Sequence, residues 1–549
     1  MSAVEQLVMN HLDLWTSVIR RKSSAGRGSS KKFELYGIRK LRELILELAV
    51  RGLLVPQDPS DEPASELLSK IATEKSRLVK EGRIKKGRTL PPISDEEKPF
   101  ELPMGWEWSR LGTIGNIFNG NSVNATVKEN KYTNVDGLPF IATKDVGYGF
   151  ETLDYHNGVC IPAEEVGFKV AKKNAVLICA EGGSAGKKCG ITDRDICFGN
   201  KLFANEPFGD VNSKFILSAY LTPTFFTQFS SAMTGIIGGI SSAKFAELVV
   251  PIAPVLEQNR IAAKVDEMIA LCDQLEQKID SSLSAHQTLV KMLMNTLSSA
   301  LDHAQFSKIW QHITTNFDTL FTTEDSIIQL QETILFMAVN GLIVELPKNS
   351  KKGLLKNFLS FGPKNGFSPN ESQSDTGQKV LKLGATSYGV LDLSQTKFFE
   401  DQISKESHLW LKAGDILLQR GNSHAFVGSS ILIENSIDNV IYPDLMMKLR
   451  VAAGVSPEYV SMWLCSPQAR KHMWERMTGT SGTMPKISKN IVETIQIVVP
   501  PIDVQEQTVS EVRKLMALCE QLKACLSGAQ TTQLHLADAI TEQALKRLP

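Results

Sequence analysis

The chain has 549 residues, and its 42% hydrophobic and 22% charged residues are typical of a globular protein large enough for several cores. Its 60 basic and 60 acidic residues cancel, which argues against a chain that coats nucleic acid but leaves room for local basic surfaces. The sequence contains no apolar run of the ~18 residues that a membrane helix needs, and its start lacks the apolar block of a signal peptide.

The eight cysteines are scattered along the chain and form no CxxC pair. Structural zinc sites and redox motifs use closely spaced cysteines. The pattern therefore predicts reduced thiols in a cytoplasmic protein, with no metal site.

The first hundred residues divide into two parts. Residues 1–32 contain a short amphipathic stretch and a Ser/Gly/Arg/Lys-rich segment, which predicts a flexible N-terminal segment. Residues 33–102 are a predicted helical region, in which one helix is followed by Gly52 as a C-cap residue and by Pro56. A second helix is expected over 65–79. The basic stretch at 80–88 suits either a solvated linker or phosphate binding.

Residues 103–253 and 349–500 have a different texture, with short apolar runs between Gly, Asn and Asp turns. This pattern predicts two inserts made mostly of strands and loops. Each insert also contains one helical stretch, predicted at 213–233 in the first and at 457–477 in the second. Prolines close both inserts.

Two long helices are predicted after the inserts, within the segments 254–348 and 501–549. In the first, apolar residues from Ile261 to Ile279 recur in steps of four and three, which is a heptad seam. Val512 to Leu526 repeat the pattern in the second. A helix of about 40 residues spans roughly 60 Å. The seams suit an antiparallel coiled coil of the two helices, or packing of each helix on its neighbouring insert.

The second half of the chain repeats the first. Ala270–Leu275 (ALCDQL) returns as Ala517–Leu522 (ALCEQL), and Leu41–Val55 returns as Leu330–Val344. Self-similarity at this scale indicates a duplicated scaffold. Because the two inserts show little likeness to each other, the chain is expected to perform one mechanical task on two different targets.

Motifs for catalysis are not found. Lys187 follows a Gly-rich run, but Glu181 stands where a nucleotide-binding P-loop needs its first glycine, and no Ser or Thr follows the lysine. The nine histidines show no metal-ligand spacing, and no Asn-Pro-Pro-aromatic run suits an amino-methyltransferase. The sequence therefore favours a binding protein over an enzyme.

Loops suited to DNA follow matching strands in the two inserts. In the first insert, the Gly-rich turn lets backbone N–H groups approach an anion, and neighbouring lysines can contact phosphate. The candidates there are Gly182, Gly183, Ser184, Lys187 and Lys188, with Lys144, Asn200 and Lys201 as further polar residues. In the second insert, Arg can bind guanine, and Gln or Asn can bind adenine, through two hydrogen bonds. The candidates there are Gln419, Arg420, Asn422, Ser423 and His424.

The sequence resembles the specificity subunits of type I restriction–modification enzymes. Leu102–Trp108 (LPMGWEW) opens the first insert in the manner of that family, and Pro254-x-x-x-Gln258 and Pro501-x-x-x-Gln505 open the two long helices. The segments 44–63, 362–368 and 478–488 also match. The resemblance covers about residues 33 to 526. It departs in two places, because the second insert lacks the LPxGW opening and the first lacks the full GTMPK loop.

The resemblance implies an α+β fold, with two mixed α/β target recognition domains joined by two long antiparallel coiled-coil helices in a pseudo-two-fold repeat. The recognition domains would be residues 103–253 and 349–500. They would read the two halves of a split, asymmetric site in double-stranded DNA. The matching segments of the second insert add Lys364, Thr480, Ser481 and Lys486 to the candidate contacts.

The resemblance also implies a subunit without catalysis. Two methylation subunits and the restriction subunits would assemble on it, and S-adenosylmethionine, ATP and Mg would bind those partners. Two other readings remain open, namely a DNA methyltransferase or nuclease with unrecognised motifs, and a coiled-coil protein adaptor. Cofactor binding by the purified chain would favour the first, and lack of sequence-specific DNA binding would favour the second.

Overall fold

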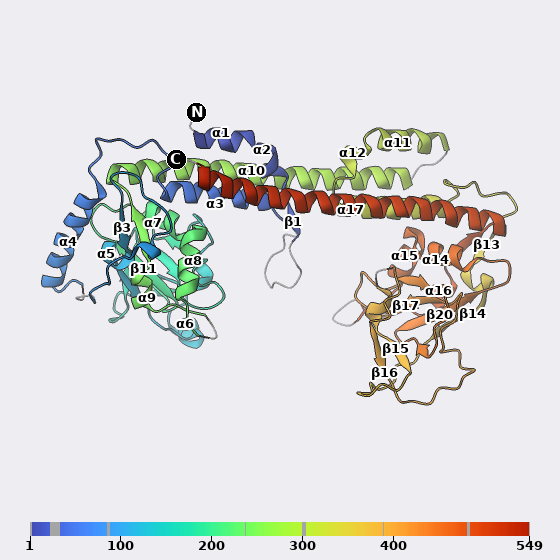
Figure 1. Ribbon diagram of the computed structural model, residues 1–549. Coiled ribbons are helices and arrows are strands. Elements are labelled where there is room, and N and C mark those ends of the chain that lie inside the picture. Colours follow the sequence, from blue (N-terminus) through green and yellow to red (C-terminus); the bar gives the residue numbers. More distant parts are fainter. Residues whose placement is uncertain are drawn as a thin grey trace. The chain divides into compact units, whose positions relative to one another are not determined.

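The computed structural model describes residues 3–21, 33–84, 88–235, 238–298, 303–387, 389–479 and 484–547. The chain divides into two compact units, residues 1–281 with 530–549 and residues 282–529 (Figure 1). The long helices α10 (Val255–Ser298) and α17 (Ile502–Arg547) each contribute residues to both units. Strands and helices are mixed in each unit, so the fold combines α and β structure.

Among the described residues, the first unit has two four-stranded sheets and two two-stranded ones. One sheet is antiparallel, in the order β4-β11-β8-β9, and the second has the order β6-β5-β10-β7, with β5 and β10 parallel. The strands are β3 (Glu107–Arg110), β4 (Gly115–Asn119), β5 (Leu138–Ile141), β6 (Cys160–Ile161), β7 (Val170–Ala171), β8 (Val176–Cys179), β9 (Cys189–Ile191), β10 (Ile196–Phe198), β11 (Leu202–Pro207) and β12 (Val249–Ile252). All four residues of β8 are buried, as its unbroken apolar run suggests.

Short helices cover these sheets. Asn212 caps α7 through hydrogen bonds from the N–H groups of Lys214 and Phe215, and Thr222 caps α8, which has proline at its start. The predicted helical stretch at 213–233 is therefore two helices with a break at Thr222. The insert's helices are α5 (Leu111–Ile114), α6 (Ala125–Lys131), α7 (Ser213–Tyr220), α8 (Pro223–Ala232), α9 (Ser242–Glu247) and the 3-10 turn η2 (Thr143–Asp145), and the 3-10 turn η1 (Asp95–Glu97) precedes the insert.

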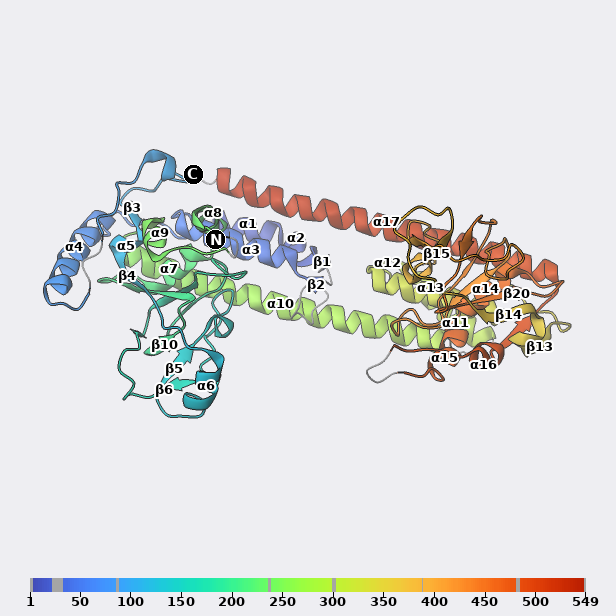
Figure 2. The ribbon, with the colours of Figure 1, turned by 90° about the horizontal axis from the view of Figure 1, so that it is seen from below.

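The helical part of the first unit contains α3 between the first half of α10 and the end of α17 (Figure 2). Gly52 follows α3 with φ +71°, as the predicted C-cap requires. The α10 seam is buried at Ile261, Val265 and Cys272, in one hydrophobic cluster with residues of α3 and the insert. The other elements are α1 (Ala3–Asn10), α2 (Leu12–Ser17), β1 (Arg20–Arg21), β2 (Phe33–Glu34), α3 (Tyr36–Val50) and α4 (Ala64–Lys80).

The second unit has an antiparallel sheet in the order β14-β20-β17-β18, a three-stranded sheet in the order β16-β15-β19, and the pair β13-β21. Its strands are β13 (Lys351–Leu354), β14 (Leu359–Asn365), β15 (Lys379–Leu381), β16 (Thr396–Phe398), β17 (Ile416–Gln419), β18 (Ser430–Leu432), β19 (Val440–Ile441), β20 (Met446–Val451) and β21 (Gln496–Val499). Its helices are α11 (His303–Thr315), α12 (Phe317–Leu320), α13 (Glu324–Val339), α14 (Pro457–Cys465), α15 (Pro467–Trp474), α16 (Lys489–Glu493), η3 (Leu355–Phe358) and η4 (Leu383–Thr386).

Helix α13 lies between the second half of α10 and the first half of α17 within the second unit (Figure 2). Val512 and Cys519 of the α17 seam are buried in a cluster with α13 residues such as Leu330 and Ile334. Parts of both heptad seams are thus buried, whereas Leu275, Ile279, Leu515 and Leu522 are half-buried. The sequence did not indicate that α3 and α13 would be neighbours of the seams. Among the described helices, none is both long and apolar enough to cross a bilayer.

Candidate nucleic-acid interface

The first candidate loop, residues 180–188, joins β8 to β9. The Gly186 N–H donates to the Cys179 carbonyl at 2.8 Å and closes the loop at its base. Gly186 has φ +71°, and a Cβ there would lie 2.6 Å from the ring of Phe229 on α8. Only glycine satisfies both the left-handed backbone and this close packing.

Two other segments meet this loop. The Ala180 N–H donates to the Lys201 carbonyl at 2.8 Å, and the Ile240 N–H donates to the Ala180 carbonyl at 3.0 Å. The Gly182 N–H donates to the Gly238 carbonyl at 2.9 Å, so this predicted anion donor already has a backbone partner. Gly183 is exposed and Ser184 half-buried at the tip of the loop.

The predicted basic residues of the first insert gather around the same loop. The Lys188 ammonium donates to the Thr143 carbonyl at 3.0 Å and lies 5.2 Å from the Tyr148 ring centroid, which ties it to the turn that presents Lys144. The side chain of Lys144 is 74% exposed. Lys187 is exposed, with its ammonium 5.7 Å from the Phe226 ring. The structure therefore brings these lysines to one edge of the insert.

Two further residues at this edge are the exposed Asn200 and Lys201, which follow β10. Lys201 lies 3.6 Å from the carboxylate of Glu181, and both side chains are about half exposed. Sequence analysis treated Glu181 only as a break in a phosphate motif. Its carboxylate is a partly exposed hydrogen-bond acceptor within the candidate interface.

The second candidate loop, residues 420–429, joins β17 to β18 in the same way. The Gly428 N–H donates to the Gln419 carbonyl at 2.8 Å, and a Cβ at Gly428 would meet Met473 of α15 at 2.8 Å. The Arg420 N–H donates to the Leu445 carbonyl at 2.9 Å. Gly428 thus has the same role in this loop as Gly186 has in the first.

The segment around Lys486 meets the second loop. The Ile487 N–H donates to the Arg420 carbonyl at 2.8 Å, and Lys486 forms an isolated bridge with Gly421. Lys486 is exposed. Thr480 and Ser481, the other predicted contacts of this segment, lie outside the described residues.

Gln419 is fully buried. Its amide nitrogen donates to the Leu383 carbonyl at 2.9 Å and to the hydroxyl groups of Thr386 and Ser387. Its amide oxygen accepts from Asn422 at 2.7 Å. Because these groups are already satisfied, the geometry assigns Gln419 to holding the loop, which argues against direct adenine contact by this side chain.

Arg420 is half-buried beside the exposed residues Ser423 and His424. Its Nε is buried and has no hydrogen-bond partner among the residues that the structure describes. The His424 ring centroid lies 5.1 Å from that of Trp474. Lys364 is exposed on the edge strand β14, which β20 separates from β17, so it lies apart from the loop.

Arg470 and Trp474 brace the second loop from α15. Arg470 donates to the Ala425 carbonyl at 2.7 Å and to the Ser429 hydroxyl at 3.1 Å, and Trp474 donates to the Val427 carbonyl at 3.1 Å. Burial lowers the pKa of Arg470, although nearby Glu332 partly opposes this. Sequence analysis missed both residues. The one sequence feature that could have indicated them is their spacing of four within the predicted helix, which places both side chains on one face.

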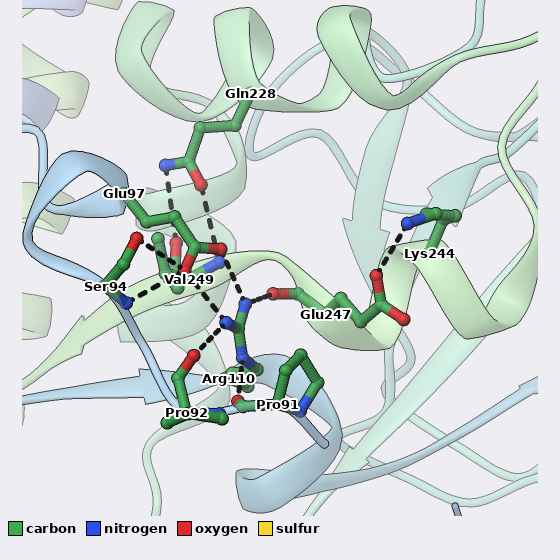
Figure 3. Close-up of polar contacts among 9 residues, drawn as sticks. All are labelled: Pro91, Pro92, Ser94, Glu97, Arg110, Gln228, Lys244, Glu247 and Val249. Carbon is green, nitrogen blue, oxygen red and sulfur yellow. Dashed lines mark hydrogen bonds and ion pairs between the residues drawn. The ribbon is translucent and has the colours of Figure 1, made fainter.

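Arg110 fastens the segment before the first insert to the insert's base (Figure 3). Its guanidinium donates to the Pro91 carbonyl at 2.7 Å, the Pro92 carbonyl at 2.8 Å and both carboxylate oxygens of Glu97. It also donates to the Glu247 carbonyl at the end of α9. The buried Arg110 therefore orients the insert relative to the chain that enters it.

No group of three or more His, Cys, Asp or Glu side chains within the described ranges could hold a metal ion. What the two edges offer is exposed lysines, an arginine, amide and hydroxyl groups and one carboxylate. These groups are suited to phosphate contact and to hydrogen bonding with base edges.

Comparison with known proteins gives consistent matches. A family model described as the type I restriction modification DNA specificity domain matches residues 103–285. The chain is 34% identical to the type I restriction enzyme EcoAI specificity subunit of Escherichia coli and 33% identical to the EcoEI specificity subunit of the same species. Both alignments cover 99% of this chain and 100% of the relative.

One solved structure, from work on complex assembly and conformational transition of the type I R-M system, is similar in fold. The TM-score is 0.50 at 15% identity, and the match covers 81% of this chain and 99% of the other.

Proposed function

Since the chain belongs to the specificity subunits of type I restriction enzymes, we propose that its two inserts read the two halves of a split, asymmetric DNA site. The observation that carries the proposal is the shared framework of the two loops. Gly186 and Gly428 each close a loop at the end of a sheet strand, and each packs on a helix, Gly186 on Phe229 of α8 and Gly428 on Met473 of α15. The loops themselves differ in sequence and length, as two different half-sites require.

The proposal extends to an internal repeat of the whole chain. The strand order β4-β11-β8-β9 in the first insert matches β14-β20-β17-β18 in the second, and both inserts have a parallel pair, β5 with β10 and β15 with β19. This correspondence supports two target recognition domains at 103–253 and 349–500. We place them on an antiparallel scaffold of α10 and α17 that sets the gap between half-sites.

Within each insert, the exposed cations are the proposed phosphate contacts, namely Lys144, Lys187 and Lys201 in the first and Lys364 and Lys486 in the second. Lys188, Gly183, Ser184 and Asn200 complete the first edge. In the second, Arg420 suits guanine, and Ser423 and His424 suit nearby polar groups. To these we add Glu181, since a carboxylate can accept a hydrogen bond from the amino group of cytosine.

The subunit acts in this proposal without catalysis of its own, in the cytoplasm. Two methylation subunits and the restriction subunits assemble on it, and S-adenosylmethionine, ATP and Mg bind in those partners. Titration of the purified chain with S-adenosylmethionine tests this directly. Binding by the chain alone would favour a methyltransferase instead.

The deciding experiment is a genome-wide map of methylated adenine in cells with and without this chain, with its methylation subunit present. A motif of two short half-sites with a fixed gap, lost on deletion, supports the proposal. Replacement of residues 103–253 by another such insert should then change one half-site only. A change in both half-sites would contradict the assignment of one insert to each.

A further inference from the structure

The sequences of the two long helices, α10 and α17, align without a gap from end to end. When Ala270–Leu275 is set against Ala517–Leu522, the end of α10 falls on the end of α17, so that Val290 matches Ala537 and Leu297 matches Ala544. All four of these side chains are at most 5% exposed. The alignment therefore pairs buried positions with buried positions. Those of α17 lie in the first unit, and those of α10 lie in the second.

The end of α17 docks on α3 within the first unit. The Tyr36 hydroxyl donates to the Asp538 carboxylate at 2.8 Å, and the Lys40 ammonium lies 3.1 Å from the same oxygen. Ala537 and Ala544 belong to the hydrophobic cluster that contains Trp15 and Ile38. The buried residues of α17 in this contact are thus small, while Leu534, Ile540 and Leu545 pack partly buried against the same cluster, and Asp538 adds a negative charge.

The end of α10 packs in the second unit, against the cluster that contains Leu320, Ile327 and Leu330. Its buried residues are large, namely Val290, Met294 and Leu297. Lys291 stands at the position of Asp538. When Leu41 is set against Leu330, Asp325 and Gln329 of α13 stand where Tyr36 and Lys40 stand in α3. This second surface therefore receives large side chains, and the exposed Lys291 gives the end of α10 the opposite charge at the position of Asp538.

At the aligned positions, the size of the buried side chains and the charge at position 538 or 291 are both reversed between the two helix ends. We infer that the α3 surface selects the end of α17 and rejects the end of α10, of its own chain or of a second copy, while the α13 surface does the opposite. An α10 end on α3 would bring Lys291 against Lys40 and force Val, Met and Leu into space filled by Ala, Thr and Ala. Overpacking and like charges both oppose that pairing.

The reverse exchange fails for the complementary reason. An α17 end on α13 would leave the volume of Val290, Met294 and Leu297 unfilled, and would bring Asp538 against Asp325. Cavities and like charges are both unfavourable. The selection therefore pairs α3 with the end of α17 and α13 with the end of α10. Its use in reading an asymmetric site rests on the proposed function, but the selection itself does not.

Charge selection is tested in the full chain by hydrogen exchange, followed over residues 530–547. D538K should accelerate exchange there by about tenfold or more, since it replaces a charge-assisted contact with repulsion. E542K is the matched control, because Glu542 is exposed one turn further along the same helix. K40E and K40E/D538K complete a double-mutant cycle, and the double variant should be less damaged than the two single effects combined.

The result that overturns the charge inference is equal exchange in D538K and E542K, or a cycle without coupling between positions 40 and 538. If D538K does not fold, D538N and Y36F provide the same comparison with milder changes. DNA binding by the inserts is measured in parallel. If the unchanged chain does not bind DNA but the variants change exchange at 530–547 as expected, the proposed function is contradicted and the selection stands.

Partner choice is tested with labelled synthetic peptides of residues 530–547 and 283–298, added to the full-length D538K chain, whose own helix end is released. The peptide 530–547 should bind about tenfold or more tightly than 283–298, since each size or charge mismatch costs a factor of this order. Equal binding of both peptides would overturn the inference.

Discussion

Arg110 and Glu97 form a two-pronged ion pair in which both nitrogen–oxygen distances are 3.0 Å. The hydrogen bonds from Arg110, followed by that from the Ser94 N–H, lower the pKa of Glu97 from 4.5 to about 2. Because the folded pKa is depressed, the contribution to stability is complete above the unfolded pKa and is lost as the pH falls from 4.5 toward 2. The pair therefore makes the attachment of the first insert acid-sensitive.

We expect E97Q to reduce the free energy of unfolding above pH 4.5 and to flatten its dependence on pH between 4.5 and 2. The side chain of Glu97 is 42% exposed, so solvent screens the pair and the effect should be about 1 kcal/mol or less. Urea unfolding over a pH series measures it, with the exposed neighbour Glu96 changed to Gln as the control. A pH profile for E97Q as steep as that of the unchanged chain would contradict the assignment.

Gln419 offers a test of stability against recognition. Q419L should lower the free energy of unfolding of the second insert by about 1–3 kcal/mol, because the partners of its buried amide lose their hydrogen bonds. Thermal unfolding of the full chain measures this loss. If Q419L keeps its stability and alters only the second half-site, the side chain contacts DNA and our placement of its role is wrong.

Lys364 should behave in the opposite way. K364A changes an exposed residue, so stability should stay within about 0.5 kcal/mol. Loss of one phosphate contact should weaken DNA binding to all sequences alike and reduce the slope of log affinity against log salt by about 1. Affinity measured over a salt series for cognate and unrelated DNA checks both parts. An altered sequence preference without a change in slope would indicate base contact instead.

Asp415 is buried between two cations of β20, the fully buried Lys448 at 3.0 Å and Arg450. Burial lowers the pKa of Lys448, and the Asp415 charge opposes this shift. D415N leaves a buried ammonium without its counter-charge, so we expect a loss of about 3–5 kcal/mol in the stability of the second insert. D193N, at an exposed ion pair of the first insert, is the control and should have little effect. An equally small loss of stability in D415N and D193N would show that the buried ion pair does not stabilise the second insert.

The sequence was sufficient to predict the elements that depend on local patterns. The α10 and α17 seams, the Gly52 cap and the strand that became β8 follow from spacing and composition alone. Periodicity shows which face of a helix is buried but not which element covers it. For this reason the positions of α3 and α13 beside the seams could not be predicted.

The candidate loops were also found from sequence, but the roles of individual residues within them were not. Gln419 and Arg420 are neighbours with similar polarity, yet one is fully buried and the other is partly accessible. That difference is set by which way each side chain leaves the strand end, and by contacts with distant Leu383 and Thr386. Glu181 was overlooked because its partner Lys201 is distant in sequence.

The last prediction concerns Leu271 and Leu518, which occupy matching positions on α10 and α17 and are 50% and 59% exposed. Leu289 and Leu536 lie 18 residues further on, which is five helical turns and hence the same face, and they are also about half exposed. Matching pairs of exposed leucines on the two helices suit two copies of one partner, as the proposed pair of methylation subunits requires.

L271D and L518D should each remove one copy of that subunit, and the double variant should remove both. Native mass spectrometry of the assembled complex gives the stoichiometry, with Q277D and A524D, matched exposed positions on another face, as controls. Retention of both copies by the double variant would show that the partner binds elsewhere.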